Sequence, residues 1–176
     1  MKTIRNVLAV LLLMAAAGCS TLDRSAAPEV DAKAQWALLP FANHTETPLA
    51  GQRAEAIAEA LLRSAGVAKL RRYPAALTQE ALFEANDRKA QEDALAWARQ
   101  QGAKYALMGA VDEWRYKVGV DGEPAVGVAL SIIDVGSGET LWSSVGAKSG
   151  WSREALSAVA QKLMRELIDQ GLSRKR

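Results

Sequence analysis

The spacing of apolar side chains predicts three helical regions in this chain. Apolar positions recur three and four residues apart between residues 54 and 62, with Glu55 on the opposite side. Residues 78–101 repeat this period in two pieces that break near Asn86. The last region, residues 156–168, carries a continuous apolar stripe. Each helix therefore has one side that other elements must cover.

Short apolar or alternating runs predict strands between and after these helices. The expected strands are residues 36–41, 67–72, 103–118, 125–135 and 140–147, with turn signals at Asp121-Gly122 and Gly136-Ser137-Gly138. Strands joined through helices should lie parallel, and the last three should form an antiparallel meander. The predicted fold class is α+β: a mixed β-sheet with helices packed on it, in the order β-α-β-α-β-β-β-α, ending in a long C-terminal helix.

The start of the chain has a different pattern. Lys2 and Arg5 precede an unbroken apolar run over residues 7–17, and small residues lead directly to Cys19. The run is too short to cross a bilayer, which needs about 20 residues, and the three parts together indicate an export signal. The small residues before the cysteine resemble the lipobox of bacterial lipoproteins, with Ala16 where leucine is commonest. We therefore expect residues 1–18 to be a signal peptide and Cys19 to be acylated.

The residues after the cysteine predict where the mature protein lies. In lipoproteins of this kind an aspartate after the cysteine usually retains the protein in the inner membrane, so Ser20 indicates the periplasmic face of the outer membrane. Residues 19–35 contain few large apolar side chains, which predicts an acylated cysteine followed by a flexible tether. Fifteen tether residues span at most about 50 Å. Residues 36–176 then form a single periplasmic domain.

Charge and cysteine content exclude several classes of partner. Removing residues 1–18 removes Lys2 and Arg5, which leaves 22 − 2 = 20 basic residues against 20 acidic ones. The pI of about 8.8 for the whole chain therefore overstates how basic the mature protein is. A balanced charge gives no reason to expect a nucleic-acid partner. Cys19 is the only cysteine, so no disulfide can form within the chain.

Candidate catalytic and metal-binding residues are few. His44 is the only histidine and lies in a polar loop without a second histidine or a cysteine to share a metal ion. Gly136 and Gly138 do not match a phosphate-binding loop, because no lysine or helix start follows them. The sequence therefore predicts a protein that is not an enzyme and that uses no cofactor and no metal.

Trp151 is the tryptophan with two competing interpretations. The other four lie inside predicted elements and are expected in the core or on half-buried faces: Trp36, Trp97, Trp114 and Trp142. Trp151 stands in a loop before the last helix, where an indole could enter the headgroup region of a membrane, with Lys148 and Arg153 contacting lipid phosphates. Alternatively, Ser152 caps the helix and Trp151 packs on Leu156 as a hydrophobic staple.

Acidic residues gather near the predicted turn between the last strands. Asp121 and Glu123 stand at the turn, and Asp112 and Glu113 lie in the strand before it. Acids in turns usually only favour the turn conformation. In a ring of identical subunits, however, one acid per subunit is repeated around the axis and would attract cationic material.

Four segments together resemble the PelC family of small outer-membrane lipoproteins of Pel exopolysaccharide export. They are residues 36–48, 51–56, 112–119 and 150–156. The resemblance implies a fold similar to periplasmic subunits of curli-type secretion channels and a homo-oligomeric ring beneath the outer membrane. It also implies an outer-membrane porin as partner and a cationic polysaccharide in transit. By the same resemblance, Trp151 contacts outer-membrane lipid and Asp121 contributes to an acidic opening.

Two other functions compete with such a ring. One is a membrane-tethered regulator, similar to lipoproteins that activate cell-wall synthases, for which the tether over residues 21–35 is short. The other is a channel-forming subunit of the curli type, which needs spare alternating segments to build a barrel. No pair of such ten-residue segments is left over in the sequence. The sequence therefore favours the ring.

Overall fold

The computed structural model describes residues 20–75, 77, 87–118 and 122–172. Among these residues one six-stranded sheet has the order β1-β6-β5-β4-β2-β3. Its strands are β1 (Ser20–Arg24), β2 (Trp36–Asn43), β3 (Leu70–Arg72), β4 (Tyr105–Tyr116), β5 (Pro124–Asp134) and β6 (Thr140–Ser149). Its helices are α2 (Ala50–Ser64), α4 (Asp87–Gln100) and α5 (Leu156–Gly171).

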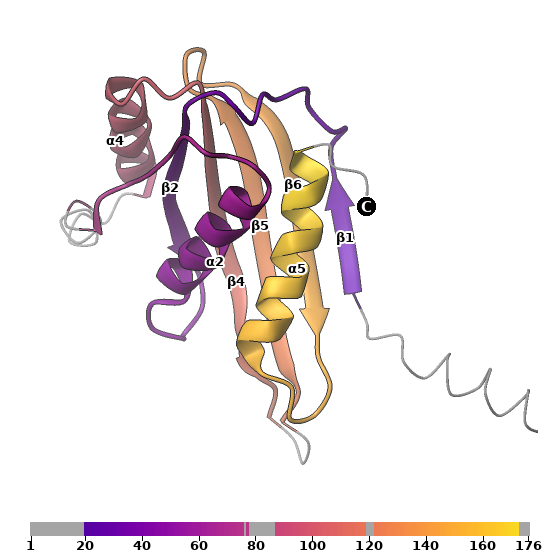
Figure 1. Cartoon of the computed structure of the whole chain (residues 1–176). Helices are drawn as coiled ribbons and strands as arrows, with labels where there is room; N and C mark the ends of the chain where they lie inside the picture. The colour runs from indigo at the N-terminus through magenta and orange to yellow at the C-terminus, as the bar shows by residue number, and fades with distance from the viewer. Residues whose placement is uncertain (1–19, 76, 78–86, 119–121, 173–176) are drawn as a thin grey trace, which may run out of the picture.

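The predicted fold class is confirmed. β2 pairs in parallel with β3 and β4, whereas β4, β5 and β6 form the antiparallel meander. Figure 1 shows α2 and α5 together in front of the sheet, where they cover one face. α4 accounts for the second of the two helical pieces expected over residues 78–101, and the first piece, with the predicted break near Asn86, lies outside the described residues.

Alternation along β5 explains how the main core forms. Val126, Val128, Leu130 and Ile132 all point to the face covered by α5, and each is at most 2% exposed. The opposite face carries a smaller core, in which α4 packs on β2 and β4. Three of the tryptophans expected inside are buried, and Trp97 is half-buried in the smaller core. The helices therefore cover different parts of the two faces.

The polar side predicted for α2 is wrong at one residue. Glu55 is buried, and its carboxylate accepts the backbone N–H of Phe41 at 3.1 Å and pairs with Arg72 at 2.8 Å. The reason lies in β2, whose register with β4 shifts between Leu38 and Phe41 around Pro40. A proline cannot donate to a ladder, and a buried N–H left beside it needs another acceptor.

The predicted tether over residues 21–35 is also wrong in part. Ser20–Arg24 form β1, which pairs antiparallel with the outer edge of β6. Leu22 lies over Gly146, where an added Cβ would come within 2.7 Å of the leucine side chain. The pairing satisfies backbone groups of β6 that would otherwise form an open edge. Later residues of the segment pack on the main core: Val30, Ala32 and Ala34.

Candidate functional site at one end of the sheet

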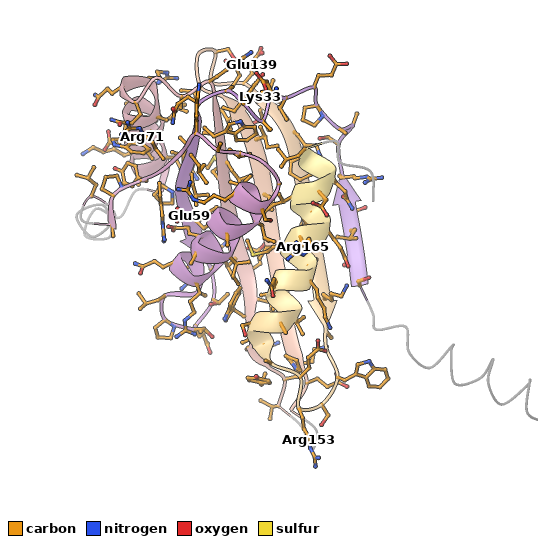
Figure 2. The ribbon with its side chains drawn as sticks, viewed as in Figure 1. Lys33, Glu59, Arg71, Glu139, Arg153 and Arg165 are labelled. Carbon is orange, nitrogen blue, oxygen red and sulfur yellow. The ribbon has the colours of Figure 1, made fainter. Side chains whose placement is uncertain are left out.

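Three segments far apart in the sequence meet at one end of the sheet. They are the start of β1, the β4–β5 connection and the loop between β6 and α5. Ser20 pairs with Lys148 near the end of β6, and the Gly150 N–H donates to the Pro124 carbonyl at 2.8 Å. Figure 2 shows Arg153 at the extreme of this end. We call this region the loop end.

The loop that carries Trp151 is a tight, internally bonded turn. The Trp151 N–H donates to the Glu154 carboxylate at 3.2 Å, and the Glu154 N–H donates to the Trp151 carbonyl at 2.9 Å. Glu154 also pairs with Lys162 of α5 at 2.5 Å, and this hydrogen bond lowers the pKa of the Glu154 carboxyl. Arg153 completes the turn with a φ of 71°. Hydrogen bonds between Trp151 and Glu154, and the ion pair of Glu154 with α5, therefore stabilise the turn.

Trp151 points away from the core. The residue is 59% exposed, although an indole usually contributes a large buried area. The staple interpretation is wrong, because α5 begins at Leu156 with Ala155 as its N-cap, three residues later than a Ser152 cap requires. Glu154, rather than Ser152, organises the turn before the helix. The helix start that the staple spacing requires is therefore not present.

The two basic residues proposed beside Trp151 lie in different places. Arg153 is exposed at the loop end (Figure 2). Lys148 pairs with Glu166 of α5 at 2.9 Å, and both side chains are less than a quarter exposed. The structure thus brings Trp151 and Arg153 together and holds the Lys148 ammonium against the helix.

The end of β4 is bonded directly to the tryptophan loop. The Tyr116 hydroxyl accepts the Leu156 N–H at 3.1 Å and donates to the Glu154 carbonyl at 3.4 Å. Lys117 donates to the Ser149 hydroxyl at 2.7 Å. Sequence reasoning missed this connection. Alternation along the strand places Tyr116 on the same face as Trp114. It does not show that Trp114 is buried while Tyr116, two residues later, is half exposed and free to contact the tryptophan loop.

The remaining candidate residues are placed only in part. Cys19 and Asp121 lie outside the described residues. Glu123 is exposed at the base of the β4–β5 connection, where its backbone carbonyl accepts the Lys117 N–H at 2.7 Å. His44 is exposed and bonds to Asp112 at 2.8 Å. In the described part of the chain, no three His, Cys, Asp or Glu residues could together hold a metal ion.

Comparisons with known proteins agree on the fold. The family model for the peptidoglycan-synthase activator LpoB matches residues 36–147. A PelC dodecamer from Paraburkholderia phytofirmans is 41% identical, with 90% of this chain and 100% of that one covered and a TM-score of 0.74. A variant of the same dodecamer is 41% identical over 86% of this chain and 98% of that one, with a TM-score of 0.72.

More distant similarity concerns the fold alone. Lipoprotein GNA1162 from Neisseria meningitidis is 20% identical, with 78% of this chain and 96% of that one covered and a TM-score of 0.55. No protein of curated function matches the chain. The helices that the structure describes are too short or too polar to cross a membrane.

Proposed function

This chain belongs to the PelC family, and from that premise we propose that it is a subunit of a ring-shaped collar under the outer membrane. The collar is not an enzyme: it guides a cationic exopolysaccharide to an outer-membrane porin. The observation that carries the proposal is the 41% identity to a dodecameric relative over 90% of this chain. Identity at that level over nearly the whole chain supports the same assembly here.

The loop end supports a fixed orientation on the membrane. Acylated Cys19 is bonded to Ser20, which pairs with Lys148 three residues before Trp151. Because β1 is part of the sheet, the lipid anchor and the exposed indole belong to the same end of the domain. Trp151 enters the headgroup region, and Arg153 contacts lipid phosphates. Because the acylated cysteine is bonded directly to the first residue of β1, each subunit stays close to the bilayer.

Asp121 and Glu123 supply the electrostatics of the opening in this proposal. They lie in the β4–β5 connection, which belongs to the loop end, so the acids belong to the membrane side of the collar. A ring repeats each carboxylate once per subunit and attracts a polymer that carries free amines. Replacing Asp121 with lysine is expected to reduce export strongly while the collar still assembles, as measured by polymer release and by crosslinking. Normal export would remove this acid from the mechanism.

Replacing Trp151 with alanine tests the membrane contact. We expect export to fall while the melting temperature changes little, because Trp151 is 59% exposed. Leu49→Ala is the matched control, since Leu49 is 57% exposed and belongs to the loop before α2. Polymer secretion and thermal unfolding are measured for both variants. A large loss of stability in Trp151→Ala, or equal export in the two variants, would contradict the proposed contact.

A second candidate function is a tethered regulator of a cell-envelope enzyme. It is favoured by the match to the synthase-activator family over residues 36–147. A regulator works as a monomer that binds and stimulates a synthase. Pull-down of a peptidoglycan synthase by the purified full-length lipoprotein, with a measured rise in synthase activity, would support this function. If the protein neither binds the synthase nor raises its activity, and forms a closed oligomer, the regulator is excluded and the collar is supported.

A further inference from the structure

We propose that Tyr116 and Val118, at the end of β4, form a second membrane-contact element beside Trp151. The loop end then rests on a phospholipid bilayer in two places, with the acyl anchor as a third point of attachment. This inference rests on the proposed membrane orientation and extends it to the end of a strand for which the sequence predicts no membrane contact.

Exposed apolar side chains are concentrated at the loop end. Seven large hydrophobic residues of the described chain are exposed: Leu22, Leu49, Leu77, Tyr116, Val118, Val145 and Trp151. Three of the seven lie at the loop end, at the end of β4 or in the tryptophan loop: Tyr116, Val118 and Trp151. Val118 is 101% exposed and Tyr116 is 50% exposed. Single exposed apolar residues are ordinary on a surface, but a group next to a lipid anchor fits an interfacial contact.

Strand register shows how far this group projects beyond the anchor. One row across the sheet joins Ser20, Lys148, Val126 and Trp114. At about 3.3 Å per residue, Tyr116 lies about 7 Å beyond that row. Val118 follows Tyr116 by two more residues in the same direction along the chain. The acylated cysteine directly precedes Ser20 in the sequence, so we expect side chains that project well beyond the Ser20 row to reach the lipid surface.

The end of β4 and the tryptophan loop are joined by hydrogen bonds. The Tyr116 hydroxyl bonds to the backbone of Glu154 and Leu156, and Lys117 bonds to Ser149. Gly150 permits the close approach, because a Cβ there would lie 2.9 Å from the Pro124 ring. A membrane that receives the indole therefore also meets the end of β4.

The chemistry of these two segments fits a bilayer interface. Tyrosine and tryptophan are the residues enriched at the level of lipid headgroups. Arg153 in the tryptophan loop and Lys117 in the β4–β5 connection are exposed cations, and both can approach lipid phosphates. Tyr116, Val118 and Trp151 are expected to insert about 5–10 Å, as interfacial segments do, while the exposed Glu123 at the base of the same connection stays in water.

Site-specific fluorescent labelling tests the second contact. Because Cys19 is the only cysteine and is acylated in the full-length protein, a Val118→Cys variant has one free thiol. The variant is labelled with an environment-sensitive dye and reconstituted into vesicles of phosphatidylethanolamine with a minor fraction of phosphatidylglycerol. Lipids that carry a quencher near the headgroup are expected to remove roughly half of the emission or more, as insertion to that depth allows.

Two further variants separate the possible outcomes. Val145→Cys is the control, because Val145 is 47% exposed and lies on β6 on the other side of the Ser20 row. Its label should escape quenching. Trp151→Cys reports the contact already proposed. Quenching at Trp151→Cys but not at Val118→Cys overturns this inference alone. Quenching at neither site overturns the membrane orientation too. A Val118→Cys label that is shielded from water but not quenched by lipid also overturns the second contact, because a protein then covers the end of β4.

Discussion

The two ends of the sheet close their connections with different chemistry. At the far end, the β5–β6 turn is polar: the Asp134 carboxylate accepts the Ser137 N–H at 2.9 Å, and Glu139 is exposed. Figure 2 shows Glu139 and Lys33 opposite Arg153. At the loop end, the connections instead expose Tyr116, Val118 and Trp151. One chain thus makes both kinds of turn, so the apolar side chains of the loop end are not needed to close a turn. They indicate contact with another surface.

The largest expected effect comes from a glycine at the loop end. A Cβ at Gly150 would lie 2.5 Å from Val159 and 2.6 Å from the Glu154 carboxylate. Gly150→Ala should therefore lower the free energy of unfolding by about 1–3 kcal/mol, as overpacked sites do. At the far end, a Cβ at Gly136 would meet only the Asp134 carboxylate at 3.2 Å, so Gly136→Ala should cost much less. Urea unfolding measures both, and equal losses would contradict the tight packing of the loop end.

A smaller effect is expected where β1 joins the sheet. Leu22→Asp removes the contact over Gly146 and should reduce stability by about 1 kcal/mol, because the leucine is 37% exposed and only part of its surface is lost from contact. Amide hydrogen exchange in β1 should accelerate, while exchange in β5 stays slow. Thr21→Asp is the neighbouring control on the other face. If both variants leave exchange in β1 unchanged, the strand is not held by Leu22.

The smallest expected effect is a change in the pKa of one carboxyl group at each end of the sheet. The Lys162 ammonium lowers the pKa of Glu154 below its usual 4.5, and the Ser137 N–H lowers the pKa of Asp134 below its usual 3.8. Each carboxylate therefore stabilises the fold fully above its usual pKa, and this contribution is lost as the pH falls through the lower folded pKa.

Removing one partner should move only one of the two pKa values. In Lys162→Met, the Glu154 pKa should rise toward 4.5 while the Asp134 pKa stays lowered. An NMR titration of the carboxyl carbons follows both groups in one sample. A Glu154 pKa that does not respond would mean that Lys162 does not hold the tryptophan loop.

Local patterns predicted the parts of this fold that depend on local physics. The alternation along β5 and the stripe along α5 gave their elements and buried faces, since period alone decides which side is apolar. β1 was missed because Ser20–Arg24 contains one large apolar residue, and its pairing with β6 joins residues more than a hundred positions apart. Nothing in the local sequence of residues 20–24 indicates that they pair with the exposed edge of β6.

The candidate site was predicted in the same uneven way. Trp151 was selected from its loop, but the staple spacing suggested a helix start at Ser152 that the structure does not have. The reciprocal bonds between Trp151 and Glu154 close a separate turn first. The contact of Tyr116 with this turn is tertiary, so neither segment alone could reveal it.

The number of subunits in the full-length acylated protein tests the collar most directly. Light scattering on the protein purified from membranes in detergent gives the mass of the assembly free of detergent. A closed assembly of the size of the dodecameric relatives is expected. A monomer that persists at high protein concentration would contradict the collar.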